Sequence, residues 1–452
     1  MKSVEELQAL GARIVEAAKK QGADVAEVLS SSSEELSTRV RVRERELIEE
    51  AGSHTVGLRV IKDDKSAATY TSDTTDAGLE LLVADAMELA ALSEPDPLAA
   101  PPDPSLLAKS FAELDLFDPT GADIDAKRAA ELALEAEVAA LDYDERITNS
   151  EGANYSRTRS AMALVTSGGF SGGYQGTYQS LSVSPLADDE GGKKRTAYDW
   201  DARRHVEMMR GAKDIGEEAA RRTLAKLGAK KVPSAQVPVV FHPDAGRALL
   251  SLLFSCIDGR AVYQRASYLC DREGDAVACP LVTIVDDPLL PRGPGSKPFD
   301  GEGLEARKNV VVVAGVLRTY LMDSYAARKL GKESTGSASR GYSGRPSVAP
   351  TNFHLLPGET SPEEIVKDVK AGLYVTSMMG FGFSAVTGDF SRGAEGFWIE
   401  DGEMKYPVGE ITISLNFDEL WKNIDAVGSD LDPKARFATP TFRVAKMTVA
   451  GS

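Results

Sequence analysis

The histidine and cysteine side chains that most often bind zinc are few in this sequence, and the histidines lie far apart. The four histidines are His54, His205, His242 and His354, and none lies within five residues of another. Zinc sites usually draw closely spaced ligands from one element, as an HExxH helix does, and neither that motif nor a Cys/His cluster occurs here. The residues alone therefore predict no metal site, while a site assembled from distant residues stays open.

One serine has the sequence surroundings of a nucleophile. Residues 169–173, GFSGG, match the G-x-S-x-G pattern around Ser171. That pattern presents a reactive serine only on a sharp turn from a strand into a helix. The following residues, YQGTY, are typical of a strand, so we interpret the match as chance in a Gly/Ser-rich run. A Ser–His–Asp triad of distant residues stays open. Walker A and G-x-G-x-x-G motifs are both missing.

Composition and charge exclude several classes of protein. The chain has 452 residues, a formal net charge of −17 and a pI of about 4.9, which disfavours nucleic-acid binding because that needs a basic face. No run of 18 apolar residues could span a membrane. The first residues, MKSVEELQAL, lack the apolar core of a signal peptide. Three cysteines, an odd number without CxxC, favour a reducing compartment, and we expect a cytoplasmic protein.

The elements of the first half alternate between helices and strands. A capping box at Ser3 and Glu6 predicts a helix that ends at Gly22. Short alternating runs then predict an antiparallel meander at 25–29, 38–43, 55–61 and 67–71. Further helices are expected at 75–92, 125–141 and 214–227, and strands over 147–184 and 195–208.

The second half begins after residues 228–235, GAKKVPSA, which have the composition of a domain boundary. A strand at 236–241 precedes a helix from Pro243 to Gly259. Mostly short strands follow, with short helices near 320–330, 362–370 and 417–421. We predict an α+β fold: a helix-plus-antiparallel-sheet domain over 1–230 and a mostly β, barrel-like domain over 235–452.

Residues 372–399 are apolar, aromatic and rich in glycine. We predict strands at 380–387 and 396–399 joined by a polar turn at 388–393. Glycine weakens a strand, so its abundance indicates bulges or close approach of another backbone. We interpret the stretch as the floor of a groove, although a tight barrel corner without a ligand fits equally well.

The amino-acid sequence of the second half resembles the TldD/PmbA family, and within it the PmbA (TldE) branch. The resemblance is dense over 236–451 and looser over 1–230. It is carried by DGRAVY at 258–263, GSKPFDGEG at 295–303, YLMDSYAAR at 320–328, VTGDFSRG at 386–393 and VGSDL at 427–431.

This resemblance implies a role in peptide processing. The TldD branch consists of zinc metallopeptidases with an HExxxH helix and a distant cysteine ligand, and the PmbA branch is its metal-free partner in a cytoplasmic heterodimer. Here the corresponding helix has His242, but Pro243 stands at the catalytic glutamate and Arg247 at the second histidine, and no cysteine lies near 392–396. A fixed cation repels a metal ion. We therefore expect no cofactor in this chain and zinc in a TldD-like partner.

The expected function is a non-catalytic subunit that shapes the substrate cleft of a TldD-type protease acting on unfolded peptides or leader peptides. A peptide added as a strand would need the close backbone approach that glycine allows. Valine at Gly380 or Gly382 should abolish processing and leave the fold intact. The alternatives are a stand-alone homodimeric hydrolase and a non-proteolytic binding or regulatory protein. The candidate cleft residues are Arg340, Asn352, Gly380, Gly382, Asp389, Ser391 and Arg392.

Overall fold

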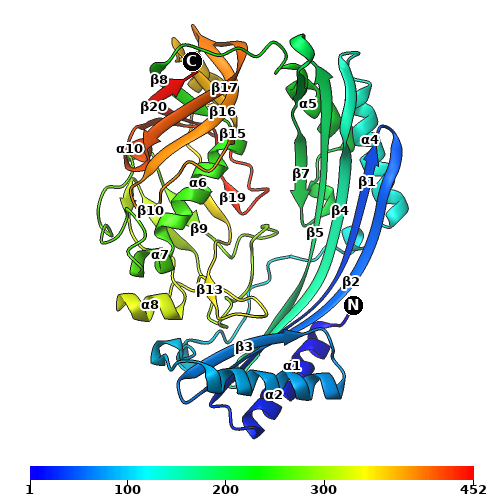
Figure 1. Cartoon of the computed structure of the whole chain (residues 1–452), viewed down its shortest axis with the longest axis vertical. Helices are drawn as coiled ribbons and strands as arrows, with labels where there is room; N and C mark the ends of the chain where they lie inside the picture. Colours follow the sequence, from blue (N-terminus) through cyan, green and yellow to red (C-terminus); the bar gives the residue numbers. More distant parts are fainter. Residues whose placement is uncertain (452) are drawn as a thin grey trace.

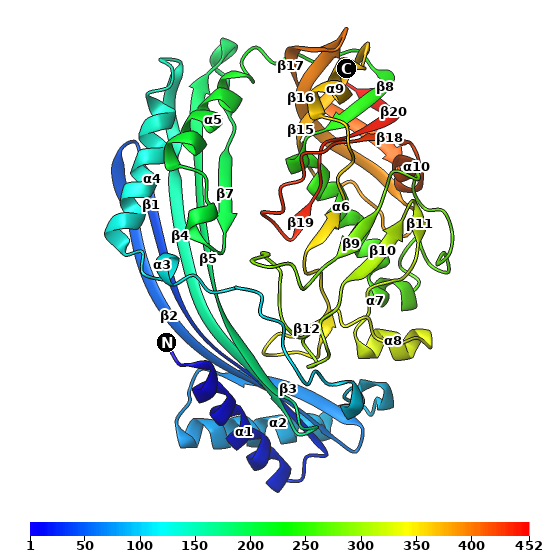
Figure 2. The same ribbon diagram turned by 180° about the vertical axis from the view of Figure 1, so that it is seen from behind.

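A long, curved antiparallel sheet forms one side of the molecule, and its concave face is turned toward a β-barrel formed by the second half of the chain (Figure 1). The structure is a computed structural model that describes residues 1–451. The view from behind shows the same two parts, joined by the segment between α5 and β8 (Figure 2). The predicted α+β fold with a barrel-like second half is confirmed.

The curved sheet has the strand order β3-β2-β1-β4-β5-β6, and β7 also pairs with β5. Its helices are α1 (Val4–Lys20), α2 (Asp76–Leu92), α3 (Pro119–Ala122), α4 (Ala126–Leu141) and α5 (Ala212–Leu224). Its strands are β1 (Val25–Arg41), β2 (Glu44–Lys62), β3 (Lys65–Thr71), β4 (Ile147–Thr166), β5 (Ser171–Asp188), β6 (Lys194–Thr196) and β7 (Asp199–Arg203).

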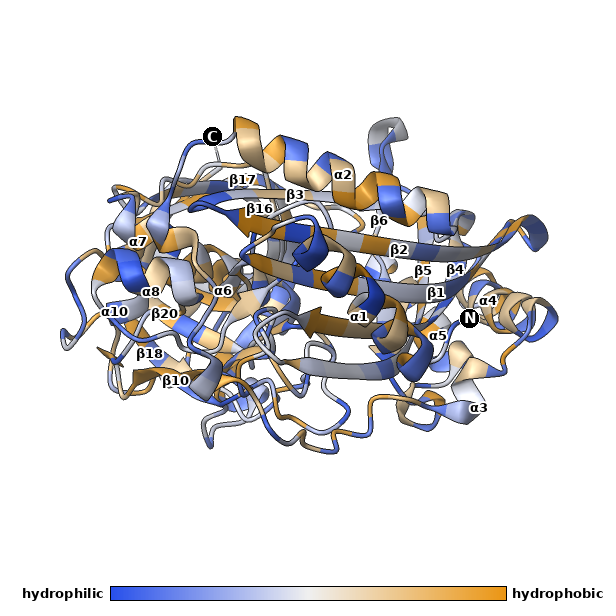
Figure 3. Cartoon of the chain, turned by 90° about the horizontal axis from the view of Figure 1, so that it is seen from below, coloured by the Kyte–Doolittle hydropathy of each residue, from blue (hydrophilic) through white to orange (hydrophobic). Residues whose placement is uncertain are grey.

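Helices cover one face of this sheet, because alternate strand residues on that face are apolar. The Ser3–Glu6 capping box begins α1 as predicted. Leu10 and Ile14 of α1 pack with Val28 and with Leu82 of α2 at one end of the sheet. At the other end, α4 and α5 contribute to a second core that includes Leu36. From below, α1 and α2 lie across the end of the sheet, and α2 carries apolar residues on its outer side too (Figure 3).

Two predictions for this half need correction. The short runs at 25–29, 38–43 and 55–61 are parts of two long strands, β1 and β2, because backbone pairing continues through the serine- and glutamate-rich residues between them. The expected strand at 195–208 is divided into β6 and β7 and ends in a 3-10 turn at Val206–Met208. Ser171 lies at the start of β5, after the turn from β4, so no helix follows it.

The second half is built on a closed barrel of β8 (Ala235–Phe241), β15 (Ala371–Met379), β16 (Asp389–Glu400), β17 (Glu403–Asn416) and β20 (Phe442–Ala450). The other strands are β9 (Ile284–Asp286), β10 (Asn309–Val313), β11 (Val316–Leu317), β12 (Ala338–Ser339), β13 (Ser347–Val348), β14 (Phe353–Leu355), β18 (Ile424–Val427) and β19 (Phe437–Ala438). Its helices are α6 (Pro243–Ile257), α7 (Gly259–Tyr263), α8 (Ser324–Leu330), α9 (Pro362–Lys367) and α10 (Phe417–Lys422). The helix expected near 320–330 thus begins at Ser324.

The glycine-rich stretch forms neighbouring strands of the barrel. The strand predicted at 396–399 is the end of a longer strand, whereas the predicted strand at 380–387 and turn at 388–393 are wrong. Residues 371–379 and 389–400 are the strands β15 and β16, and the turn lies at 385–388. Gly380 has a φ of +84° and Gly388 a φ of +77°, so the chain leaves and re-enters regular strand conformation at these two glycines. Between them, Phe383 still bridges to Phe390, which makes 380–381 a bulge in an extended hairpin.

The two halves meet through buried polar contacts at the lower end of the sheet. Glu27 on β1 accepts hydrogen bonds from Arg59 at 2.7 Å and from Arg340 at 2.8 Å, and all three side chains are buried. The Tyr342 hydroxyl lies 2.6 Å from the Ser31 hydroxyl. The loop around Arg340 is therefore fixed on the concave face. No helix among residues 1–451 is long and apolar enough to cross a membrane.

Candidate functional site

Helix α6 begins at His242, and this histidine acts as the N-cap of the helix. Its Nδ1 accepts a hydrogen bond from the Asp244 backbone N–H at 3.1 Å, and Pro243 occupies the first helical position. Proline is favourable there because its missing N–H would have no intrahelical partner. Burial, with help from the nearby cations Arg222 and Lys434, lowers the pKa of His242 below its ordinary value. Since Nδ1 accepts, the neutral ring carries its proton on Nε2.

Arg247, one turn further along α6, packs against the first half of the chain. Its guanidinium carbon lies 4.8 Å from the centroid of the Trp200 ring on β7, and Lys434 Nζ lies 4.4 Å from the same centroid. Arg222 on α5 donates to Asp244 on α6 at 3.3 Å. The N-terminal turns of α6 therefore join the barrel to the curved sheet.

These side chains do not fit a zinc ion. His242 Nδ1 is engaged as a helix cap, Pro243 offers no donor, and Arg247 brings a permanent positive charge. Among residues 1–451, no three His, Cys, Asp or Glu side chains gather in a way that could hold a metal ion. Burial raises the pKa of Cys256 to about 12 and also raises that of Cys279, so these two thiols stay protonated.

A cavity of about 250 Å³ lies beside His242, between α5 and the barrel. Its wall combines aromatic and charged side chains, with residues from both halves of the chain. The residues that line it are Ala197, Tyr198, Glu218, Arg221, Arg222, Ala225, Lys226, His242, Asp244, Tyr374, Thr376, Ser377, Phe397 and Met404. Such a mixed lining suits a segment of polypeptide, which offers apolar and polar groups together.

The cavity borders a strand edge that is open for pairing. β8 pairs with β15 only over Leu373–Val375, because the chain turns into α6 at His242. Beyond that point no strand among residues 1–451 pairs with this edge of Thr376–Met379. An extended peptide could continue the sheet there by backbone hydrogen bonds, with its side chains near the cavity.

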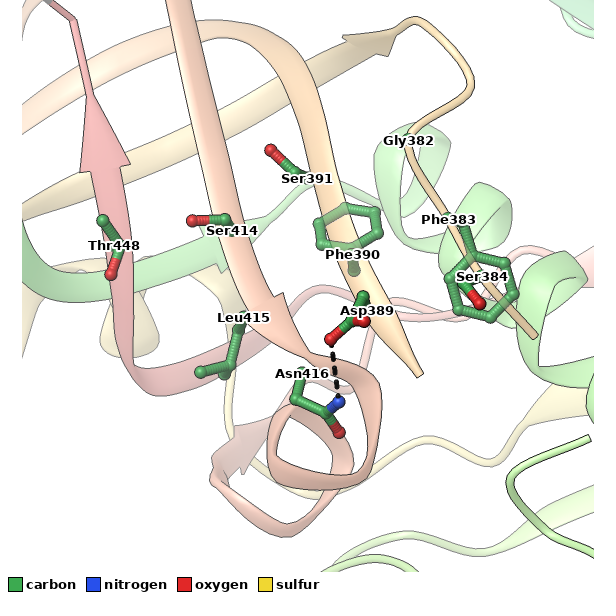
Figure 4. A pocket seen from close by; sticks show the side chains of 10 residues that line it. All are labelled: Gly382, Phe383, Ser384, Asp389, Phe390, Ser391, Ser414, Leu415, Asn416 and Thr448. Atoms are coloured by element: carbon green, nitrogen blue, oxygen red, sulfur yellow. Dashed lines mark hydrogen bonds between the residues drawn. The ribbon is translucent and has the colours of Figure 1, made fainter. Parts of the chain in front are cut away.

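The hairpin of β15 and β16 borders a second, wide depression of about 530 Å³ on the outside of the barrel (Figure 4). Three of the predicted cleft residues, Gly382, Asp389 and Ser391, lie together in it. The Asn416 amide donates to Asp389 at 3.5 Å, the contact drawn in Figure 4. Arg392 is paired with the buried Ile413 and therefore faces the opposite side of β16 from Ser391.

Family models match nearly the whole chain. The first domain of the PmbA/TldA metallopeptidases matches residues 26–90, the central domain 119–227 and the C-terminal domain 234–451. The metalloprotease PmbA of Escherichia coli O157:H7 is 34% identical over 428 residues, 95% of this chain and 92% of that protein. The chain belongs to the PmbA/TldD family.

Two solved structures share the fold over nearly their full length. A Bacteroides thetaiotaomicron protein, described as a candidate modulator of DNA gyrase, superposes with a TM-score of 0.92 at 27% identity and covers 99% of both chains. TldE from Thermococcus kodakarensis superposes with a TM-score of 0.89 at 22% identity, covering 98% of this chain and 100% of that one. At 22% identity, the similarity to the Thermococcus protein shows a shared fold alone.

The remaining predicted cleft residues lie apart from both hollows. Arg340 is buried, donating to Gly301 O as well as to Glu27. Asn352 is buried, with its amide donating to Asp287 O and Ser296 and its oxygen accepting from Gly295 N. Gly380 lies at the bulge of the hairpin, next to Phe381, whose side chain is 96% exposed.

The structure also changes what a valine at Gly382 would do. A Cβ atom built there would lie 1.8 Å from the Ser391 carbonyl oxygen, which is closer than any real contact. Valine at Gly382 would therefore distort the hairpin itself, and the expectation of an intact fold is wrong for this position. A Cβ atom built at Gly380 would meet no atom within 4 Å. A valine there would therefore lower stability only because of the positive φ of this residue.

Sequence reasoning missed the residues that surround His242. Trp200, Arg222 and Tyr374 lie between 20 and 132 positions away in the sequence, and topology alone brings them to α6. No local spacing connects them. The one usable signal was Pro243 after His242, which indicates a helix start and hence an N-cap histidine.

Proposed function

We propose that this chain is the non-catalytic subunit of a two-subunit zinc metalloprotease in the cytoplasm. A TldD-like partner supplies the zinc ion, and this chain shapes the cleft that receives unfolded peptides, including leader peptides. Membership of the PmbA/TldD family, whose relatives bear the name metalloprotease, supports a proteolytic setting. The open edge of β15 beside the His242 cavity supports a role in holding an extended peptide.

The observation that carries this proposal is the use made of helix α6. A zinc peptidase needs ligands and a carboxylate that activates water. In this chain the residues at the positions of the HExxxH motif have structural roles. His242 caps the helix, Pro243 begins it and Arg247 packs on Trp200. The helix is thus committed to joining the two halves of the molecule.

The test compares the purified chain, a TldD-like protein from the same organism and the co-expressed pair. We expect well below one equivalent of zinc per chain in the first sample after dialysis against zinc. Cleavage of an unfolded peptide should appear only in the pair and should be abolished by a chelator.

Two controls make this test specific. Replacing the zinc-motif glutamate of the TldD-like protein by glutamine should remove all activity from the pair while the complex still forms. Arg247→His in this chain should not create a zinc site, since His242 Nδ1 still caps the helix and no cysteine lies near 392–396. Firm zinc binding, or chelator-resistant hydrolysis by the chain alone, would contradict the proposal and favour a self-sufficient hydrolase.

A further inference from the structure

The outer edge of β2 over residues 44–55 has no strand beside it. β1 pairs with β2 along its whole length, whereas β3 pairs only with Val56–Lys62. Glu44 through His54 are all exposed. Unpaired N–H and C=O groups in such an edge readily pair with another chain, and proteins usually shorten, twist or cover long edges. Here twelve residues are left uncovered within the described structure.

The hairpin that carries this edge is held in place rather than loose. Its turn residues Val42 and Arg43 both have positive φ, as in a tight hairpin turn. Their backbone N–H groups donate to the two carboxylate oxygens of Glu137 on α4, at 2.9 and 2.7 Å, and Glu137 is fully buried. β1 is paired on both sides. The hairpin rises beside α4 on the outer side of the molecule (Figure 2). The edge therefore needs little ordering before it binds.

The edge is also strongly acidic. Residues 44–55 contain Glu44, Glu46, Glu49 and Glu50 against one arginine, Arg45. Glu46 is paired with Arg39 at 2.9 Å. The other three glutamates have no ion-pair partner among residues 1–451.

The free carboxylates occupy both faces of the strand. Glu49 lies opposite Ser37 on the concave face of the sheet, and Glu50 lies opposite Leu36 on the face that α4 covers. A strand added along this edge would therefore meet a carboxylate on either side. The half-exposed side chains of Leu47 and Ile48 lie between these charges and offer apolar contact.

The charge pattern identifies the occupant. Two copies of this edge paired antiparallel would bring eight glutamates together with only two arginines, an excess of like charge that is destabilising. We propose that the edge of residues 44–55 binds an extended, cationic polypeptide segment by strand addition, with lysine or arginine side chains beside Glu44, Glu49 and Glu50. This rests on the proposed function only in taking an unfolded peptide as the ligand. The net charge of −17 attracts the same class of segment over longer range.

The experiment uses the full chain and two fluorescent twelve-residue peptides, one alternating lysine and threonine and one alternating glutamate and threonine. Anisotropy titrations at low and at moderate salt give the affinities. Hydrogen exchange of the chain with and without the lysine peptide locates the contact. The test variant is Glu49→Lys with Glu50→Lys. The matched control is Glu80→Lys with Glu88→Lys on the exposed side of α2, which changes the net charge equally.

We expect the lysine peptide to bind, the glutamate peptide not to bind, and amides of 44–55 to exchange more slowly in the complex. The Glu49/Glu50 variant should lose about tenfold in affinity, the size expected for two surface charge pairs reversed. The control should stay within about twofold. Equal loss in both variants, protection elsewhere, or concentration-dependent protection of 44–55 without peptide would overturn the proposal. The peptide titration needs no protease, so a negative result would not contradict the proposed function. A negative result in the zinc and cleavage test would likewise not contradict peptide binding at this edge.

Discussion

His242 is a residue whose two nitrogens have separate tasks. Nδ1 accepts from Asp244 N–H and caps α6, while Nε2 keeps the proton of the neutral ring. Protonation would convert Nδ1 into a donor and remove the cap. It would also place a positive charge close to Arg222 and Lys434. Burial, followed by the nearby cations Arg222 and Lys434, lowers the pKa of His242, and the folded state therefore disfavours the charged ring.

The first prediction concerns pH and His242. A histidine with a lowered folded-state pKa contributes stability that is complete above its unfolded pKa of about 6.5 and is lost as the pH falls below that value. His242→Asn keeps a capping acceptor without a titrating ring. Its melting temperature should therefore fall less than that of the unmodified chain between pH 7.5 and 5.5. Some dependence should remain, because burial also lowers the pKa of His354.

The control is His242→Ala, which lacks the cap and should lose about 1 kcal/mol even at pH 7.5. Thermal denaturation followed by circular dichroism measures all three proteins. An asparagine variant with the same pH slope as the unmodified chain would show that His242 does not carry this dependence.

At the scale of elements, local signals predicted helix starts well and strand limits poorly. The capping residues of α1 and α9 and Pro243 of α6 lie within a few positions of the helices they begin. Strand limits depend on the partner strand. β1 continues through polar residues because β2 and β4 pair with it on both sides. In the glycine-rich stretch, the positive φ of Gly380 and Gly388 decides where the strands end, and composition does not reveal a φ angle.

The second prediction separates two kinds of glycine in this hairpin. A Cβ at Gly396 would lie 1.8 Å from the Tyr374 carbonyl oxygen, so β15 and β16 would have to move apart. Gly396→Ala should cost about 3 kcal/mol of unfolding free energy. Gly380→Ala meets no atom within 4 Å and should cost about 1 kcal/mol for its positive φ alone. Chemical denaturation measures the free energy of unfolding of both variants. Equal losses would contradict the interpretation that the backbone of β15 approaches Gly396 too closely for a side chain.

At the scale of the whole molecule, the two halves are joined by polar contacts at both ends of the space between them. At one end, Arg247 and Lys434 flank Trp200, and Arg203 binds Asp432 through two 2.9 Å hydrogen bonds. At the other end, Glu27, Arg59 and Arg340 form the buried cluster. The hydrogen bonds of Arg203 to Asp432 and of Arg340 to Glu27 join residues 229 and 313 positions apart, which is why Arg340 could be predicted as notable but not as a joint between halves.

The third prediction tests whether that joint couples the halves during unfolding. Arg340→Ala leaves the buried Glu27 with Arg59 as its one cationic partner and removes the hydrogen bond to Gly301 O. Losing one partner of a buried charge cluster is strongly destabilising, here by about 3 kcal/mol. The hydrogen bond from Arg340 to Glu27 joins a loop of the second half to β1. Its removal should therefore weaken the contact between the two halves. Calorimetry should then show the single transition of the unmodified chain separating into two.

Arg345→Ala, in the same loop, is the control for the third prediction. Arg345 is exposed and lies 3.7 Å from Asp96, so its removal should change stability by less than about 1 kcal/mol and leave one transition. Arg340→Lys should give an intermediate result, since an ammonium can reach one acceptor but cannot serve Gly301 and Glu27 in the same fixed geometry. If Arg340→Ala lowers the melting temperature without separating the transitions, the cluster stabilises one half internally and does not hold the two together.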